Sequence, residues 1–362
     1  MVLPAFPGAV NLEAFAPRWP WLNGDLQTLR DSLRPQRLPA DHGQPHRFLL
    51  DDGDQLLGLL DPPLPAVSQG RPLAVVVVVH GLAGGSDRIG PRRLALTLQR
   101  AGFAVLRLNL RGAGPGRQLA RGSYAAQSNR DLVPVLRQMR QLAAGLPLLG
   151  VGLSLGGTNL LNAVVHAEPE ALLDGLVCMS SPLDLQACSR QIARPRNRLY
   201  ERWLLRRLVA EAAADPHGLA PAERIALGQG QLRSIRGFDA AITAPRWGYP
   251  SVEAYYADAS PLPRLLERPQ QRPPTLIVHA LDDPWVPVAA AQQLHQGLAT
   301  ARQQGDQPPA ALEVLLTSAG GHNGFHARSD SSAAVGGCWS DRLAARWLQR
   351  LIADQLLSSP SA

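Results

Sequence analysis

The amino-acid sequence predicts an α/β fold with a mostly parallel central sheet, helices on both faces and one inserted helical segment. From Leu73 onward, short runs rich in β-branched residues alternate with longer helical stretches, which is typical of a covered parallel sheet. The alternation stops after Ser181, and no convincing strand follows until Thr275. In addition, the pentapeptide at 152–156, GLSLG, lies between a strand-like run and a helix-like run. That setting is typical of an exposed serine nucleophile.

The first part of the chain predicts an extension followed by a sheet. Residues 1–45 are rich in Pro, Trp, Leu and Arg, and we expect them to pack on the core as an N-terminal extension. Residues 46–181 form the predicted first part of the core, beginning with an antiparallel hairpin around the turn at 51–54, DDGD. Its further predicted elements are the strands 75–79, 104–109, 146–151 and 175–179 and the helices 90–100, 127–144 and 155–166.

Residues 182–245 predict a helical cap inserted into the core. Its clearest helix spans 199–214, where apolar residues recur at spacings of three and four and so predict one apolar face. The residues of that face are Leu199, Trp203, Leu204 and Leu208, beside Arg202, Arg206 and Arg207. Such a face fits either the wall of an acyl pocket or ordinary core. Residues 246–362 complete the core, with predicted strands 275–279 and 312–317 and helices 288–298 and 340–357.

The composition excludes several classes of function. The net charge of +7 is compatible with a nucleic-acid surface. However, all 36 basic residues are arginine, and such one-sided usage is more typical of genomic bias than of a binding surface. A chain without lysine cannot form a P-loop, a Ser–Lys dyad, a Schiff base or a pyridoxal site. We expect no cofactor, no metal and no nucleic-acid partner. The cap arginines are compatible with peripheral contact to a membrane carrying anionic head groups, and the sequence leaves the oligomeric state open.

The cysteines and the N-terminus predict a cytoplasmic protein. Cys178, Cys188 and Cys338 are odd in number and have neither metal-ligand spacing nor a disulfide framework. The first seven residues, MVLPAFP, lack the basic start and apolar run of a signal peptide. No run of the sequence approaches the length and apolarity of a membrane span.

Three residues in chain order predict an acyl-transfer site. A serine hydroxyl needs a base to take its proton and an acid to orient that base. Ser154 follows one predicted strand, Asp283 follows the strand 275–279, and His322 follows the strand 312–317 in a glycine-rich loop. Because the carboxyl ends of parallel strands meet at one edge of a sheet, these side chains are expected to lie together.

Two of these positions have alternatives in the sequence. Asp282 is adjacent to Asp283, and we favour Asp283 for its spacing to Val286 and Pro287. Asp283 could instead only cap the following helix. His326 is the alternative to His322.

The developing oxyanion needs two backbone N–H donors. Leu155 follows the nucleophile directly and supplies the first. The loop at 80–85, HGLAGG, follows the strand 75–79, and there we choose Leu82 as the second donor. The loop could otherwise be a plain glycine turn.

Taken together, these motifs resemble the YheT-like branch of the α/β-hydrolase superfamily, which includes bacterial predicted hydrolases and eukaryotic abhydrolase-domain lipid esterases. The resemblance runs nearly end to end. The matching segments are 21–28 (WLNGDLQT), 80–82 (HGL), 109–112 (NLRG), 152–159 (GLSLGGTN), 238–245 (FDAAITAP), 255–260 (YYADAS) and 321–325 (GHNGF).

The resemblance implies the α/β-hydrolase fold, a triad of Ser154, Asp283 and His322, and hydrolysis of carboxylic esters. The implied substrates are short- or medium-chain acyl esters, acylglycerols and phospholipids included. The sequence departs from the family pattern at Asp25, where a histidine is usual, and between Arg111 and Ser123, where a usual cysteine and its spacing are altered. These departures bear on substrate rather than on reaction class.

Two other functions compete with ester hydrolysis. A catalytically silent interaction protein could use the same fold, although such a module would have no physical need for all three triad residues. The glycines at 150, 152 and 156 could also form a dinucleotide-binding loop. That loop needs a carboxylate at the end of the next strand, which here ends in Met179-Ser180-Ser181.

Overall fold

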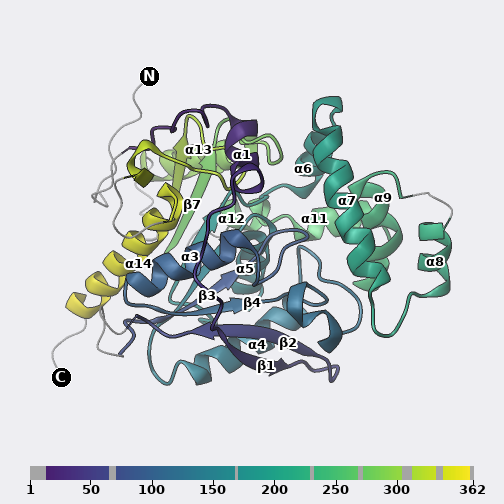
Figure 1. Cartoon of the computed structure of the whole chain (residues 1–362), viewed down its shortest axis with the longest axis horizontal. Coiled ribbons are helices and arrows are strands. Elements are labelled where there is room, and N and C mark those ends of the chain that lie inside the picture. The colour runs from purple at the N-terminus through teal and green to yellow at the C-terminus, as the bar shows by residue number, and fades with distance from the viewer. Residues whose placement is uncertain are drawn as a thin grey trace.

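The computed structural model describes residues 14–64, 71–167, 170–228, 232–267, 272–303, 312–331 and 337–358. Residues 1–13 of the predicted N-terminal extension lie outside the described residues. Within them the chain builds one eight-stranded sheet in the order β1-β2-β4-β3-β5-β6-β7-β8 (Figure 1). The strands are β1 (Gln44–Leu49), β2 (Gln55–Asp61), β3 (Val75–Val79), β4 (Ala104–Leu108), β5 (Leu148–Leu153), β6 (Gly175–Met179), β7 (Thr275–Ala280) and β8 (Leu312–Thr317).

The sheet is antiparallel only at one edge. β1 pairs with β2 and β2 with β4 in antiparallel fashion, and every later pair is parallel. The predicted mostly parallel sheet is therefore confirmed. β5 begins at Leu148 rather than at 146 because Pro147 has no N–H to donate to the ladder.

Helices cover both faces of the sheet. α3 (Ile89–Arg100) and α14 (Trp339–Ser358) pack on one face, and α4 (Asn129–Leu142), α5 (Leu155–His166), α12 (Leu262–Glu267) and α13 (Ala289–Gln303) pack on the other. β3 shows why both faces are apolar. Its side chains at 75, 77 and 79 join one core cluster and those at 76 and 78 join the other.

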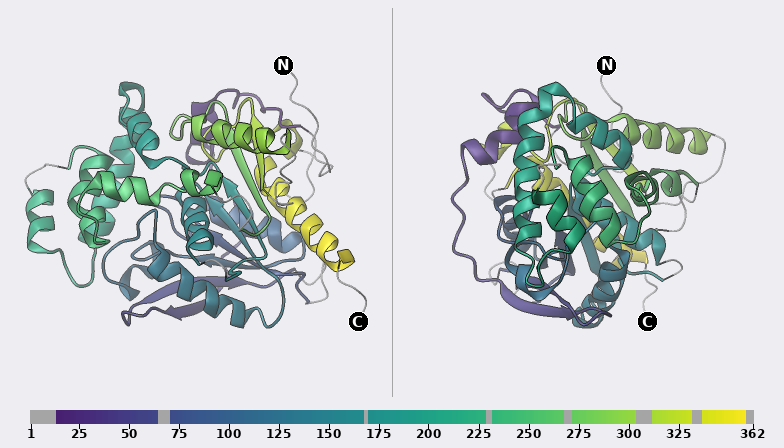
Figure 2. Two further views of the ribbon diagram at one scale, coloured as in Figure 1. Left: turned by 180° about the vertical axis from the view of Figure 1, so that it is seen from behind. Right: turned by 90° about the vertical axis from the view of Figure 1, so that its right-hand side faces the viewer.

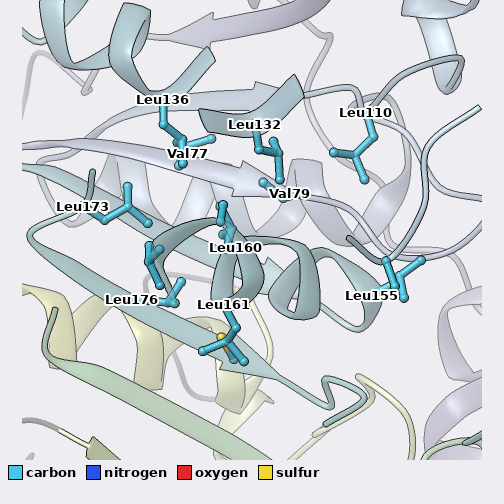
Figure 3. Close-up of a cluster of buried hydrophobic side chains, with 14 of the residues drawn as sticks. Val77, Val79, Leu110, Leu132, Leu136, Leu155, Leu160, Leu161, Leu173 and Leu176 are labelled. Atoms are coloured by element: carbon cyan, nitrogen blue, oxygen red, sulfur yellow. The ribbon is translucent and has the colours of Figure 1, made fainter. Parts of the chain in front are cut away.

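The larger core cluster lies directly beneath the site. Figure 3 shows leucines of α4 and α5, among them Leu132, Leu136 and Leu160, packed against Val77 and Val79 of β3. These side chains are fully buried. The packing fixes β3, β5 and α5. The serine turn joins the carboxyl end of β5 to the amino end of α5.

A run of helices follows β6 and projects from one side of the sheet (Figures 1 and 2). We call this run the cap segment. It contains α6 (Leu185–Ile192), a 3₁₀ turn (Pro195–Asn197), α7 (Arg198–Ala213), α8 (Pro221–Gly228), α9 (Ile235–Phe238), a π-helical turn (Asp239–Thr243) and α10 (Ala244–Arg246). The described part of this segment holds no strand. The exact division of the chain into extension, core and cap stays a prediction.

The prediction that α7 has a single apolar face is wrong. Leu204 and Leu208 are buried in the cap, whereas Leu199 is 79% exposed and Trp203 is 45% exposed. The two pairs lie on different sides of the helix, because the midpoint of positions 199 and 203 is about 140° around the helix axis from the midpoint of positions 204 and 208. The successive spacings of four, one and four residues had merged two faces into one.

A short helix in the N-terminal extension was not predicted. α1 (Gly24–Leu33) is capped by Asn23, whose side chain accepts a hydrogen bond from the N–H of Leu26 at 2.9 Å. α11 (Val252–Ala259) follows the cap segment and is similarly capped by Ser251. No helix among the described residues has both the length and the apolarity to cross a bilayer.

Candidate active site

Ser154 occupies a strained turn between β5 and α5. Its backbone has φ 52° and ψ −125°, a conformation that non-glycine residues rarely adopt. The turn is tight because its glycines touch backbone. A Cβ on Gly156 would lie 2.3 Å from the carbonyl oxygen of Val79, and one on Gly152 would lie 2.2 Å from the Cα of Gly157. The packing of backbone on backbone thus holds the serine outward.

The structure brings His322 against Ser154. The Nε2 atom of His322 lies 2.8 Å from the Oγ of Ser154, and its Nδ1 atom lies 2.9 Å from the Oδ2 of Asp283. His322 follows β8 and Asp283 follows β7, so three neighbouring or near-neighbouring strands deliver the three side chains to one edge. The imidazole and the carboxylate are both buried.

Asp283, not Asp282, faces the imidazole. The second carboxylate oxygen of Asp283 accepts hydrogen bonds from the N–H groups of Trp285 and Val286 at 2.8 and 2.9 Å. Burial alone would raise the pKa of Asp283, but the adjacent His322 and the N–H of Val286 hold it below its ordinary value. Asp282 instead accepts a hydrogen bond from the N–H of Gly321 at 2.9 Å, and burial raises its pKa.

α1 holds the loop that carries His322. The N–H of His322 donates to the Oγ1 of Thr28 at 2.8 Å. Gln27 is bonded twice to the backbone of His326, accepting from its N–H at 2.7 Å and donating to its carbonyl at 3.0 Å. Sequence reasoning missed this role of α1, although the motif at 21–28 was the available signal.

His326 lies away from the serine. Its Nε2 atom is 3.5 Å from Asp31, and burial, followed by the charge of Arg93, lowers its pKa to about 3. Among the described residues, His322 is the histidine whose ring lies within hydrogen-bond distance of the Oγ of Ser154. The alternative that the sequence left open for the base therefore has no geometric support.

The loop at 80–85 passes directly over the serine. A Cβ on Gly81 would lie 2.9 Å from the Cβ of Ser154. Within the described part of the chain, no group accepts a hydrogen bond from the N–H of Leu82 or of Leu155, whereas the N–H of Ala83 donates to the hydroxyl of Tyr124 at 2.7 Å. The two predicted oxyanion donors are thus free, and their neighbour is not.

His80 ties this loop to the next strand end. The N–H of Leu110 donates to the Nε2 of His80 at 3.2 Å, so the ring proton sits on Nδ1 and is donated to the carbonyl of Gly81 at 2.8 Å. Complete burial lowers the pKa of His80 to about 4. The neutral imidazole is the form that makes both bonds.

Trp285 covers the outer face of the imidazole. Its ring stacks on His322 with the centroids 4.6 Å apart and the planes 29° apart. Two aromatic rings of α7 pack on Trp285 in turn, Tyr200 at 5.3 Å and Trp203 at 6.5 Å between centroids. An aromatic column therefore connects the imidazole to the cap segment, and nothing in the sequence indicated it beyond the position of Trp285 beside Asp283.

The cap segment also holds the turn that carries Asp283. The amide of Asn197 donates to the carbonyl of Pro284 at 2.7 Å, and the amide of Gln191 reaches the same oxygen at 3.3 Å. The thiol of Cys188 lies 3.6 Å from the carbonyl of Trp285.

Within the described residues, no group of three or more His, Cys, Asp or Glu side chains could hold a metal ion.

Comparison with known proteins shows the family of the chain. The family model described as serine aminopeptidase, S33, matches residues 70–306. The YheT protein of Escherichia coli is 32% identical over 86% of this chain and 86% of its own length. Phospholipase ABHD3 of Mus musculus is 30% identical over 69% of this chain, which spans 58% of that relative.

Solved structures match in fold. A soluble variant of monoglyceride lipase from Saccharomyces cerevisiae, in complex with a substrate analogue, superposes with a TM-score of 0.53. It is 18% identical, and the match covers 88% of this chain and 98% of that one. An esterase of Pyrococcus furiosus superposes with a TM-score of 0.52 at 13% identity, over 88% and 97% of the two chains.

The sheet order and the strand-to-helix serine turn define an α/β-hydrolase. Within that superfamily the chain belongs to the YheT-like family, as its motifs had indicated. It is accordingly an enzyme of the carboxylic ester hydrolase class.

Proposed function

We propose that the enzyme cleaves carboxylic esters through a Ser-His-Asp triad and a covalent acyl-enzyme. The observation that carries the proposal is the continuous pair of hydrogen bonds from Ser154 to His322 and from His322 to Asp283, 2.8 and 2.9 Å long. Both lengths fall within the range of direct proton transfer between side chains. The strained backbone of Ser154 supports the same role.

Each triad residue has one task in this mechanism. His322 takes the hydroxyl proton through Nε2 as the oxygen of Ser154 attacks the ester carbonyl. Asp283 keeps the proton of the resting imidazole on Nδ1 and stabilises the imidazolium that forms. The imidazolium then protonates the departing alcohol, and a water molecule, activated by the same imidazole, hydrolyses the acyl-enzyme.

The oxyanion would be bound by the N–H groups of Leu82 and Leu155. Both N–H groups lack a partner among the described residues. Leu155 directly follows Ser154, and Leu82 directly follows Gly81, which lies against Ser154. Hydrogen-bond donors held in place before the reaction stabilise the charge that develops on the carbonyl oxygen. The two bonds of His80 would hold the Leu82 donor in position.

The substrates are short- or medium-chain acyl esters, acylglycerols and phospholipids included. Leu82 and Ala83 pack against the apolar interior of the cap, which includes Leu205, Leu208 and Phe238. An acyl chain beside the serine would therefore meet apolar walls. The names of relatives point the same way, since one is a phospholipase and another, from Saccharomyces cerevisiae, is a medium-chain fatty acid ethyl ester synthase/esterase.

The test compares the wild type with Ser154→Ala on nitrophenyl esters of increasing acyl length. We expect kcat to fall by about 10⁴-fold or more in the variant, because removal of the nucleophile leaves only binding and oxyanion stabilisation. The exposed Ser32→Ala variant serves as the control and should keep full activity. A fluorophosphonate probe should label the wild type and Ser32→Ala but not Ser154→Ala.

Two results would overturn the proposal. Equal rates for the wild type and Ser154→Ala would favour a catalytically silent interaction protein. Attachment of the probe to another residue would contradict the mechanism even if the enzyme hydrolysed esters.

A further inference from the structure

The outward face of α7 has an unusual composition. Arg198, Leu199, Arg202, Trp203 and Arg206 are spaced i, i+1, i+4, i+5 and i+8, so they form one stripe along the helix. All five side chains are exposed. We call this set the α7 stripe. It joins three cations to two large apolar side chains, of which Leu199 is 79% and Trp203 45% exposed.

No acidic side chain balances the α7 stripe on its own helix face. Glu201 lies half-buried on the inward side, where its carboxylate accepts a hydrogen bond from the N–H of Ile235 at 3.1 Å. Glu211 is also half-buried and faces Arg207 and Arg88. In the described part of the chain, the guanidinium groups of the stripe make no ion pair. They are therefore available to an external anion.

Further cations and an apolar side chain extend the stripe. Arg190 and Arg194 precede it and are exposed. Arg196 and Tyr200 bond the carboxylate of Asp25 at 2.8 and 3.0 Å, which places the start of α1 beside the start of α7. Leu22, shortly before α1, is 49% exposed.

We propose that the α7 stripe docks the enzyme on a lipid bilayer that carries anionic head groups. Arginines beside a bilayer attract anionic phosphates. Transfer of exposed Leu and Trp side chains from water into the apolar boundary of the bilayer lowers the free energy. A nucleic acid would use the three charges but leave Leu199 and Trp203 in water. A bilayer is the partner that satisfies both kinds of side chain.

The docked face lies next to the catalytic imidazole. Trp203 of the stripe packs on Trp285, and Trp285 stacks on His322. Docking through α7 would therefore bring the cap side of the active site to the membrane surface. The proposal concerns binding and does not depend on the proposed triad.

The test measures sedimentation of the full chain with unilamellar vesicles of phosphatidylcholine, with and without phosphatidylglycerol. We expect the wild type to bind the anionic vesicles more tightly and to be released by salt. Each arginine near a charged bilayer contributes about fivefold to affinity, so R198E/R202E/R206E should weaken binding by about 100-fold or more. L199S/W203S should also weaken it, by about tenfold or more.

The matched control is R34E/R37E/R47E, which makes the same change in net charge at three exposed arginines outside the cap. It should lose far less affinity than the stripe variant. Hydrolysis of a water-soluble nitrophenyl ester by R198E/R202E/R206E should equal that of the wild type, which shows that the variant is folded and separates this test from that of the triad.

Several outcomes would contradict the docking proposal. They are failure of the wild type to bind anionic vesicles, equal loss in the two triple variants, and unchanged binding by L199S/W203S. Tighter binding to a DNA duplex than to the vesicles in the same buffer would also overturn it, because the partner would then be a nucleic acid.

Discussion

The two halves of the active site are held in different ways. The serine half, formed by β3, β5 and α5, is fixed by contacts of backbone on backbone at Gly152 and Gly156. The acid half, formed by the loops after β7 and β8, also touches backbone, since a Cβ on Gly321 would lie 2.3 Å from the carbonyl oxygen of Gly24, but it is held in addition by side chains that come from elsewhere in the chain. Thr28 supports the His322 loop, and Asn197 supports the Asp283 turn. The comparison teaches that the serine turn is held by backbone packing within its own segment and against β3, whereas the placement of His322 and Asp283 also depends on side chains from distant parts of the chain.

The difference has a physical consequence for tolerance to change. Any side chain at Gly156 would collide with the backbone of β3, which cannot move without breaking the sheet. The acid half has, beside its own backbone contacts, side-chain hydrogen bonds that can be removed one at a time. Substitutions there should change catalysis in graded steps.

The largest expected effect distinguishes the two adjacent carboxylates of the acid half. Asp283→Asn should lower kcat by about 10⁴-fold, because an amide favours the wrong tautomer of the base and cannot stabilise the imidazolium. Asp282→Asn is the matched control and should cost about tenfold at most, since Asp282 accepts a hydrogen bond from the backbone N–H of Gly321 and not from the imidazole. Steady-state kinetics on a nitrophenyl ester measure both. A loss in Asp282→Asn as large as that in Asp283→Asn would make the acid assignment wrong.

A smaller effect tests whether the cap segment positions the acid half. Asn197→Ala should lower kcat by about tenfold with little change in KM, because the carbonyl of Pro284 loses its shorter bond and the Asp283 turn relaxes. Asn162→Ala is a close match, since both amides are buried and each donates to two backbone carbonyls. Both variants should lose about 1–3 kcal/mol of unfolding free energy.

Only the substitution at 197 should change kcat. Chemical denaturation and kinetics on the same samples separate the two effects. Equal kcat in the two variants would mean that the cap contributes stability alone and does not position the turn.

The same contrast explains how much the sequence could predict. The strand, turn and helix around Ser154 form one continuous segment with strong local patterns, and the sheet followed from alternation of short apolar runs and helices. The sequence favoured Asp283 over Asp282 by spacing alone, because the hydrogen bonds that distinguish the two carboxylates, to His322 and to the N–H groups of Trp285 and Val286, are visible only in the structure. Their assigned roles stay predictions until the variants are measured.

The contacts that complete the site join residues far apart in the chain. Thr28 meets His322, and Asn197 meets Pro284, across separations that no local pattern encodes. The prediction of one apolar face on α7 was wrong for a different reason. The spacings were compatible with one apolar stripe. In the structure Leu204 and Leu208 are buried, whereas Leu199 is 79% and Trp203 is 45% exposed.

The smallest expected effect concerns His80, whose two hydrogen bonds support the loop over Ser154. Its pKa is lowered to about 4 by burial, whereas an unfolded chain has a histidine pKa of about 6.5. Between these values the unfolded state binds the extra proton, so stability is lost as the pH falls from about 6.5 toward 4. His80→Gln keeps a donor and an acceptor but cannot titrate. The drop in unfolding free energy from pH 7 to pH 5 should therefore be smaller in the variant by about 1–2 kcal/mol.

Urea unfolding at the two pH values measures this difference. His326, with its pKa lowered to about 3, remains in both proteins and keeps part of the acid sensitivity in the variant. An identical drop in wild type and His80→Gln would mean that protonation of His80 costs the fold nothing. The loop over Ser154 would then be held by its glycine contacts alone, and the serine half would rest entirely on backbone packing.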